Sequence, residues 1–470
     1  MALKSRGISS RTARNLRKDA SVELNSHHET ATPSKPMTPN AIDPYIPGSG
    51  NTGYSVTHYD LDITYRVATN RLEGQAIINA VCDEPLNRIA LDLSTALKVG
   101  KVKVNGAGVA KFSHKENKLR LKLQGSIGEG ERIRIEVKYA GRPQPVNNLF
   151  GSIGWEELTE GALTANQPNG ASTWFPCNDH PSAKASYRIA VTTESVYRAL
   201  ANGTLQSTKS GPGTTTRVYD QPEPMSPYLA TIQIGHYATH TVATTPVPIT
   251  AALPPRLRTN FDHDFARQNR MMKLFSQLFG PYPFPSYTVV VTDDALEIPL
   301  EAQCMSVFGA NHCDGTRHSE RLIAHELAHQ WFGNSVTAAQ YRDIWLHEGF
   351  ACYAEWLWSE NSDGPAAKEW AEHYWLKLNR SSKDLILTDP GPRNLFDDRV
   401  YKRGALTLHS LRTRIGDDPF FSLLQDWTNR YRYSTVTTAD FTELATHYTA
   451  QPLDDLWSDW LRKKPLPDLP

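Results

Sequence analysis

The sequence contains the stretch HELAHQWFG at residues 325–333, in which two histidines flank a glutamate. On an α-helix, residues four apart lie on one face, so His325 and His329 can direct both imidazoles at one metal ion. The HExxH pattern fixes only three positions and also arises by chance in helices. A third ligand at a suitable spacing is therefore needed before the pattern indicates a metal site.

A third ligand is available in the stretch WLHEGFA at residues 345–351, which belongs to the next predicted helix. Eighteen residues separate Glu348 from His329, so this helix can pack back on the first and present a carboxylate. A catalytic zinc site has three protein ligands and one open position for water. We predict that His325, His329 and Glu348 bind one zinc ion per chain. A metzincin-type site is disfavoured, because Phe332 and Ser335 occupy the positions where it needs glycine and histidine.

The composition gives no sign of a nucleic-acid-binding or membrane protein. Lys+Arg and Asp+Glu number 50 each in the 470 residues, and no run approaches the ~18 apolar residues of a membrane span. The five cysteines are odd in number and form no CxxC pair, which fits a reducing compartment and predicts a cytoplasmic location. They are Cys82, Cys177, Cys304, Cys313 and Cys352.

The pattern of residues divides the chain into three parts. Residues 1–49 are rich in arginine and contain five prolines between Pro33 and Pro47, which predicts a disordered tail. No apolar segment follows the charges, so the tail is not a secretory signal. An organellar transit peptide would share the arginine and serine bias, and Met37 is an alternative initiator.

The remaining two parts differ in periodicity. Residues 50–244 show period-two alternation, for example at 59–67, 119–123, 133–139 and 187–191, which predicts an antiparallel β domain with turns at Asn105-Gly106 and Gly125. Residues 245–470 contain a predicted strand at 287–291 and predicted helices, which indicates an α+β or mainly helical domain. The helices are expected at 320–332, 343–358, 366–378, 400–414, 419–430 and 438–448.

Together with Glu348, the stretch HELAHQWFG closely resembles the aminopeptidase N-like family of zinc peptidases, which are gluzincins. WFPCNDHP at 174–181 and FGPYPF at 279–284 resemble further segments of that family, so the resemblance covers roughly residues 50 to 460. It implies an α+β fold, with a thermolysin-like catalytic domain behind a β-rich N-terminal domain. Many members carry a further helical domain. This sequence ends at Pro470, about where a catalytic domain should finish, so we expect a short form without it.

The resemblance assigns Glu326 as general base. The chemistry agrees, because zinc lowers the pKa of its water to about 7 and a neighbouring carboxylate can pass the proton to the leaving amine. It also assigns Tyr401, in VYKRGA at 400–405, as a hydrogen-bond donor to the oxyanion, with Arg403 where the family has lysine. The alternative for Glu326 is a solvated helix glutamate without a catalytic role. The alternative for Tyr401 is a half-buried aromatic residue at the start of a helix.

An aminopeptidase must bind a free ammonium group, and a carboxylate at the end of a short pocket does so. The family uses a Gly-x-Met-Glu-Asn segment, which IPLEAQ at 298–303 matches imperfectly, and this implies that Glu301 binds the amine. Glu297 is a nearby competitor. Gln167, in ANQP at 165–168, matches the residue that the family's N-terminal domain lends to the same amine, although a polar loop glutamine needs no such role.

Ligating histidines usually donate their second N–H to a carboxylate or carbonyl. Glu355, seven residues after Glu348 and so on the same helix face, is one candidate, and Asp343 is another. His347 points away from the ligand face and is not a predicted ligand, and Cys352 is expected to pack.

The sequence therefore predicts a zinc aminopeptidase that acts on peptides with a free N-terminus. One alternative is a zinc endopeptidase of the same fold, which gains support because the Gly-x-Met-Glu-Asn segment is degraded. The other is a catalytically inactive family member that serves as a binding module.

Overall fold

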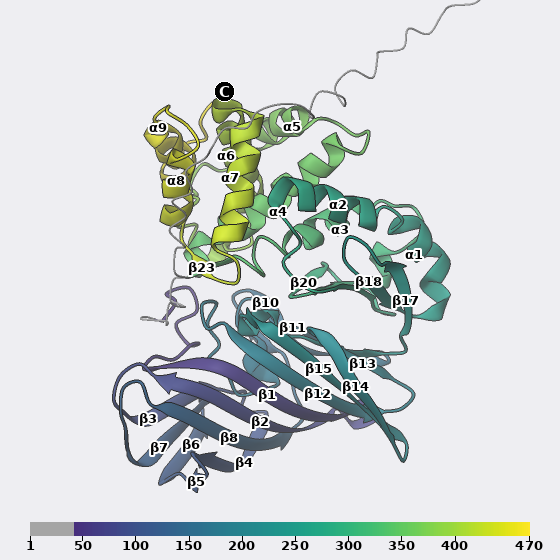
Figure 1. The fold of residues 1–470 in the computed structure, drawn as a ribbon, viewed down its shortest axis with the longest axis vertical. Coiled ribbons are helices and arrows are strands. Elements are labelled where there is room, and N and C mark those ends of the chain that lie inside the picture. The colour runs from purple at the N-terminus through teal and green to yellow at the C-terminus, as the bar shows by residue number, and fades with distance from the viewer. Residues whose placement is uncertain (1–41) are drawn as a thin grey trace, which may run out of the picture. The chain divides into compact units, whose positions relative to one another are not determined.

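A large twisted sheet forms the N-terminal part of this computed structural model, which describes residues 42–470 (Figure 1). Within the described chain it has eight strands in the order β14-β15-β12-β1-β2-β8-β4-β5. Buried Tyr59, Leu61, Ile63 and Tyr65 alternate along β1, as the period-two pattern predicts. The strand bounds are β1 Tyr54–Arg66, β2 Arg71–Cys82, β4 Leu97–Val104, β5 Ala107–Gly108, β8 Arg132–Gly141, β12 Ala185–Glu194, β14 Thr204–Gly211 and β15 Thr214–Met225.

Two smaller sheets complete this β-rich domain. One has the order β3-β7-β6 and the other β13-β16-β11-β10-β9. Their bounds are β3 Leu86–Asp92, β6 Lys111–Lys115, β7 Lys118–Ile127, β9 Val146–Asn148, β10 Gly151–Leu158, β11 Gly161–Ala165, β13 Arg198–Ala201 and β16 Ile232–Gly235.

Some details of the β domain differ from the sequence prediction. β1 and β12 pair in parallel, which needs a long crossover, and the chain from β2 to β11 provides it. Asn105 and Gly106 form the predicted turn, with φ values of 49° and 80°. Gly125 lies inside β7 instead of in a turn.

The second sheet system belongs to the C-terminal half and has the order β17-β18-β19-β21-β20. Along β19, Val289 and Val291 pack in the core shared with the helices, whereas Val290 packs in the core of the β domain. The sheet is therefore buried on both faces. Its bounds are β17 Ala238–Ala243, β18 Ile249–Leu253, β19 Tyr287–Val291, β20 Leu300–Ala302 and β21 Met305–Phe308. It begins at Ala238, which is before the domain boundary expected at 244/245.

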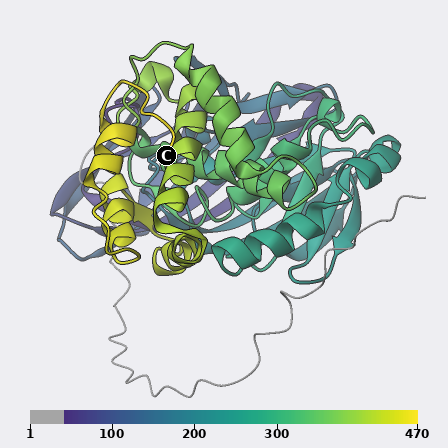
Figure 2. The ribbon, with the colours of Figure 1, turned by 90° about the horizontal axis from the view of Figure 1, so that it is seen from above.

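Helices cover the far face of this sheet, and Figure 2 shows them lying over the strands when the molecule is seen from above. The six predicted helices are present with small shifts at their ends, and α1, α2 and α9 were not predicted. The bounds are α1 Arg258–Asp264, α2 Gln268–Phe279, α3 Glu320–Ala328, α4 Trp345–Glu360, α5 Ala367–Asn379, α6 Asp398–Ile415, α7 Asp417–Arg430, α8 Thr438–Thr446 and α9 Asp454–Trp457.

Helices α4 and α6 cross at two glycines. A Cβ atom on Gly349 would lie 2.8 Å from the Cα atom of Gly404, which no side chain tolerates. Gly349 follows Glu348, and Gly404 lies one turn after Tyr401. The close approach of the two glycines therefore brings the helix segments that carry Glu348 and Tyr401 together.

The segment before β1 packs on the C-terminal half of the molecule. Asp43, Tyr45 and Ile46 are buried, and the last two join the core of the helices and the second sheet. The predicted disordered tail over residues 1–49 included these positions, and their burial differs from that expectation. Residues 1–41, with the possible start at Met37, lie outside the described residues.

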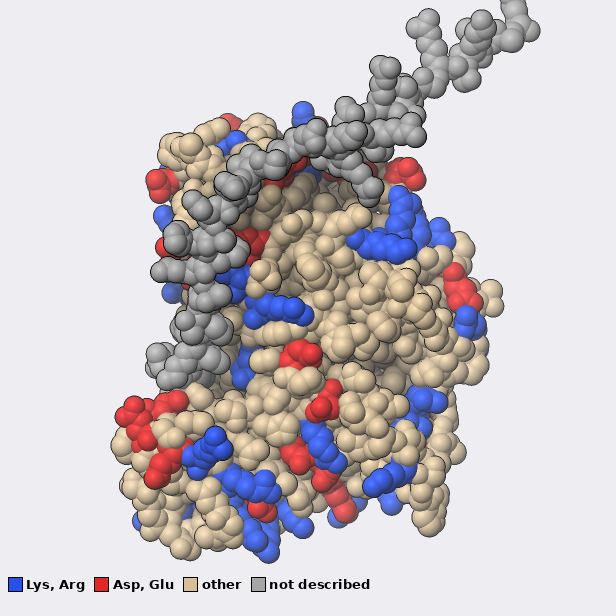
Figure 3. Space-filling view, in the orientation of Figure 1, with Lys and Arg blue, Asp and Glu red and all other residues tan. Residues whose placement is uncertain are grey.

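The helices and the charged surface can be compared with the composition of the chain. In the described part of the chain, no helix is both long and apolar enough to cross a membrane. Figure 3 shows Lys/Arg and Asp/Glu side chains interspersed on the visible face, in keeping with the formal net charge of zero.

Candidate metal centre and active site

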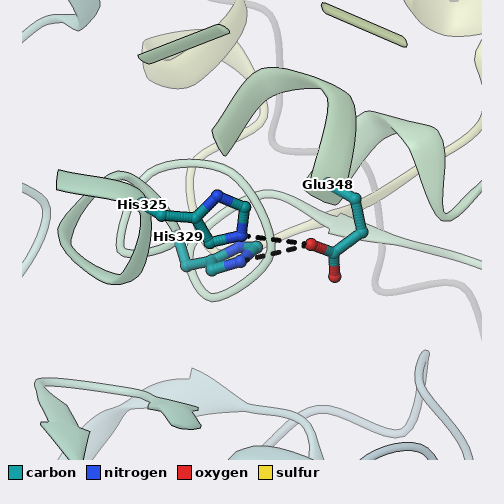
Figure 4. A group of neighbouring side chains, drawn as sticks. All are labelled: His325, His329 and Glu348. Carbon is teal, nitrogen blue, oxygen red and sulfur yellow. Dashed lines mark ion pairs between the residues drawn. The ribbon is translucent and has the colours of Figure 1, made fainter. Parts of the chain in front are cut away.

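His325, His329 and Glu348 converge as predicted (Figure 4). His325 lies in α3, His329 caps the C-terminus of that helix, and Glu348 comes from the first turn of α4. Oε2 of Glu348 lies 3.4 Å from Nε2 of His325 and 3.5 Å from Nε2 of His329. Ligand atoms about 2.1 Å from a tetrahedral zinc ion lie about 3.4 Å from one another, so the three donors fit zinc.

The second nitrogen of each histidine is already engaged. Nδ1 of His325 lies 2.8 Å from Oε1 of Glu355, and Nδ1 of His329 lies 3.0 Å from the carbonyl oxygen of Phe332. Both partners accept hydrogen bonds, so each imidazole carries its proton on Nδ1 and directs the Nε2 lone pair at the shared point. Glu355 thus has the position predicted for a histidine partner. The same expectation for Asp343 is wrong, because Oδ1 of Asp343 accepts from Thr438 at 2.6 Å.

Burial and charge make the centre bind protons when no metal is present. Burial alone would lower the pKa of His325 and His329, but the neighbouring carboxylates raise these pKa values to about 9 and about 10. The same contacts hold the pKa of Glu348 below its usual range in spite of burial. A cation that replaces these protons meets a deprotonated ligand set, so metal binding releases protons.

Glu326 lies beside the metal ligands with one oxygen unpaired. Its side chain is buried, and Oε2 has no hydrogen-bond partner among residues 42–470. Burial raises the pKa of Glu326 to about 7, although His325 and His329 oppose this rise. Burying one carboxylate oxygen without a partner is costly, and perturbed buried carboxylates are concentrated at functional sites.

Glu301, at the middle of β20, joins the same group of side chains. Ligand atoms of Glu301, Glu326 and His329 all lie within 4.8 Å of one another. Burial raises the pKa of Glu301, and the nearby His329 lowers it. Glu297, the competitor for its role, is exposed and belongs to neither group of potential metal ligands found in the described chain.

Tyr401 lies on the first turns of α6 and faces the zinc ligands. Its ring stacks on that of His325, with centroids 6.0 Å apart and planes inclined by 21°. Burial, followed by the charge of Glu348, raises the pKa of its hydroxyl well above the usual value. The hydroxyl therefore keeps its proton and remains a hydrogen-bond donor at neutral pH.

Gln167 lies in the loop that follows β11. The hydroxyl of Tyr341, from the catalytic half, donates a hydrogen bond to the carbonyl oxygen of Pro168 at 2.5 Å. The amide nitrogen of Gln167 is inaccessible and has no partner in the described part of the chain. The loop is thus tied to the segment before α4, and its glutamine retains an unused hydrogen-bonding group.

Residues 263–460 match the peptidase family M1 domain, and residues 55–229 match the peptidase M1 N-terminal domain. The chain belongs to peptidase family M1. This confirms the resemblance drawn from the HExxH stretch with Glu348 and from the segments at 174–181 and 279–284.

Several M1 relatives resemble the chain over most of its length. A leucyl aminopeptidase of Saccharolobus solfataricus is 24% identical over 88% of this chain and 54% of its own length. Aminopeptidase 2 of Candida albicans is 23% identical over 87% of this chain and 47% of its own. The chain therefore spans about half the length of these curated relatives.

A solved structure matches over nearly its whole length. The M1 zinc metallopeptidase from Deinococcus radiodurans is 29% identical, with a TM-score of 0.83, and the match covers 91% of this chain and 98% of that one. The zinc for which that enzyme is named agrees with the spacing of the three donors described above. Zinc is therefore the metal cofactor, and the His325, His329 and Glu348 cluster could hold it.

The M1 chain also uses residues that the sequence did not single out. Nζ of Lys184, from the β domain, donates to the carbonyl oxygens of Asn334 at 3.0 Å and Ser335 at 2.7 Å. The hydroxyl of Tyr228 donates to the carbonyl oxygen of Gly333 at 3.1 Å. Lys184 and Tyr228 therefore both stabilise the turn that follows α3. Because the partners lie more than 100 positions apart, no local pattern points to them.

Proposed function

We propose that this protein is a zinc aminopeptidase, which hydrolyses the N-terminal peptide bond of peptides with a free α-amino group. The observation that carries the proposal is the position of Glu301, whose carboxylate lies within 4.8 Å of Glu326 and of the zinc ligand His329. A carboxylate so close to the metal ligands leaves room for one residue between an ammonium group and the reacting carbonyl. The names of the two aminopeptidase relatives support this choice.

Each side chain of the site has a role in this proposal. When bound, zinc supplies Lewis-acid chemistry, which makes a water molecule more acidic and a carbonyl group more electrophilic. Glu326 takes the proton of the attacking water and delivers it to the nitrogen of the leaving amine. A carboxylate can act first as acceptor and then as donor in such a transfer.

Tyr401 and the amine-binding residues act on the substrate itself. The protonated hydroxyl of Tyr401 donates a hydrogen bond to the oxygen that becomes negative as the carbonyl carbon turns tetrahedral. Glu301 pairs with the substrate ammonium, and the amide carbonyl oxygen of Gln167 accepts a further hydrogen bond from it. An N-acetylated peptide has no positive charge for Glu301 and is excluded.

Two alternatives make different predictions. A zinc endopeptidase of the same fold would cleave blocked peptides, and the degraded segment around Glu301 favours it. An inactive binding member would hold zinc without turnover, and the unpaired oxygen of Glu326 argues against it.

We further propose a cytoplasmic location, which the five unpaired cysteines of the described chain support.

The Glu326→Gln variant tests the proposed chemistry. It should retain one zinc ion per chain, because Glu326 is not a ligand, and lose at least about a hundredfold in kcat, because the proton acceptor is gone. Metal analysis and hydrolysis of leucine p-nitroanilide give both quantities. Full activity with bound zinc would refute the role of Glu326.

A further inference from the structure

Gln330 follows the zinc ligand His329 and reaches the hairpin that carries Glu301. Its side chain is fully buried, with 0% exposure. Oε1 accepts a hydrogen bond from the backbone N–H of Cys304 at 2.9 Å, and Nε2 donates to the carbonyl oxygen of Ala302 at 3.0 Å. Both ends of one amide therefore bind the turn between β20 and β21, within three residues of Glu301.

The turn that Gln330 holds is conformationally unfavourable. Cys304 has a φ of 64°, the left-handed region that residues with a Cβ atom seldom adopt. Such backbone persists only where the surroundings impose it, and it is concentrated at functional sites. Gln330 supplies the hydrogen-bond acceptor for the N–H of this residue, so its amide supports the strained position directly.

The other contacts of the hairpin come from elsewhere in the chain. Nδ2 of Asn334 also donates to Ala302, and Nδ2 of Asn202, in the β domain, donates to the carbonyl oxygen of Gln303 at 2.9 Å. These hydrogen bonds do not depend on the side chain of Gln330. What the hairpin loses without that side chain is the direct link to the residue beside a zinc ligand.

We propose that Gln330 is a positioning residue that fixes the distance between the zinc centre and the amine-binding carboxylate of Glu301. This inference rests on the proposed function. A peptide is cleaved after one residue only if its ammonium group and its first carbonyl fit both partners at once. Misplacement of either partner by about 1 Å is costly for such a fit. Gln330 follows His329 in the chain, and its amide binds Ala302, which follows Glu301. This hydrogen bond therefore links the zinc centre to the amine-binding residue.

Two substitutions of Gln330 test the hydrogen bonds made by its Oε1 and Nε2 atoms. Gln330→Met keeps the length of the side chain and removes both hydrogen bonds. Gln330→Glu keeps an acceptor for Cys304 and removes the donor to Ala302, and it serves if the methionine variant does not fold. Trp331→Phe is the matched control, because the indole N–H of Trp331, at the same helix end, donates to the carbonyl oxygen of Gly280 at 2.9 Å instead of to the hairpin.

The expected result is a change in substrate binding without loss of metal. Gln330→Met should bind one zinc ion per chain and show a KM for leucine p-nitroanilide raised about tenfold, with kcat within about threefold of wild type. Trp331→Phe should lower Tm and leave KM unchanged. Calorimetric binding of leucine amide to Glu326→Gln, with and without Gln330→Met, should show the same weakening in the absence of turnover.

A double-mutant cycle with Glu301→Ala shows whether Gln330 acts through Glu301. If it does, the Glu301→Ala and Gln330→Met double variant has the KM of Glu301→Ala alone, whereas independent effects would multiply. Multiplying effects, an unchanged KM in zinc-loaded Gln330→Met, or loss of zinc in proportion to activity would each overturn the inference. A wild-type enzyme without preference for free amines would instead overturn the proposed function, and the role of Gln330 with it.

Discussion

The carboxylate of Glu355 lies 2.8 Å from Nδ1 of His325 and 3.2 Å from the guanidinium of Arg321. This arrangement orients His325, the first of the proposed zinc ligands. Burial of Glu355 opposes ionisation, but its hydrogen bonds and neighbouring cations lower its pKa to about 2. The carboxylate therefore stays charged and raises the basicity of His325 as a ligand.

Glu355→Gln should weaken zinc binding by about tenfold, because the neutral amide no longer stabilises the positive charge that the metal brings. Competition with a chromogenic chelator measures this affinity. Asp343→Asn is the control, since Asp343 binds Thr438 and not a histidine, and its zinc affinity should equal that of wild type. Equal affinities in both variants would remove Glu355 from the metal site.

Replacing Glu301 or Glu297 by glutamine shows which of the two carboxylates binds the substrate amine. Glu301→Gln should raise KM for aminoacyl anilides by about tenfold or more, because a charge-assisted bond to the ammonium group is lost. Glu297→Gln should leave KM unaltered, since Glu297 is exposed. Steady-state kinetics on both variants decides the matter, and the reverse pattern would transfer the amine-binding role to Glu297.

Tyr401→Phe removes one hydroxyl and little volume. We expect kcat to fall about a hundredfold with KM nearly unchanged, as found when one donor to an oxyanion is removed. Tyr353→Phe is a matched control, because the Tyr353 hydroxyl contacts His409 and lies outside the site. An unchanged kcat in Tyr401→Phe would assign oxyanion stabilisation to other groups.

Asp179, in the β domain, gives the protein a pH-dependent stability that is independent of the metal. Burial, followed by the negative charge of Asp92, raises the pKa of Asp179 to about 8. An unfolded aspartate has a pKa of about 3.9, so between about pH 4 and pH 8 the folded state holds the extra proton. Stability should therefore fall as pH rises through this window.

Asp179→Asn should remove this dependence, because a neutral amide needs no proton to be buried. Thermal unfolding between pH 5 and pH 8 should show a smaller loss of Tm in the variant than in wild type. Asp468→Asn removes a charge from an exposed aspartate and should retain the wild-type slope. Parallel slopes in all three proteins would show that Asp179 is ionised in the folded state.

Much of the site was predictable because its key spacings are local. Helical periodicity places His325 beside His329, and it also places Glu355 on the face of Glu348. The close approach of α4 and α6 at Gly349 and Gly404 was not predictable, since it joins two helices through residues that carry no chemistry.

The parts that escaped prediction depend on contacts between distant segments. Asp43 lies in a proline-rich segment of low apparent order, yet its carboxylate accepts the N–H of Tyr341, almost 300 positions away. Gln330 lies inside the motif itself, but its role depends on the turn at Cys304, whose left-handed backbone no pattern in the sequence announces. Composition describes such segments on average, whereas burial against a partner determines their order.

The most direct test compares free and N-acetylated leucine p-nitroanilide as substrates of the zinc-loaded, chelated and zinc-restored protein. We predict that only the free amine is cleaved, that a chelator abolishes cleavage, and that zinc restores it. Chelator-sensitive cleavage of the acetylated substrate at a comparable rate would contradict the aminopeptidase assignment and favour an endopeptidase.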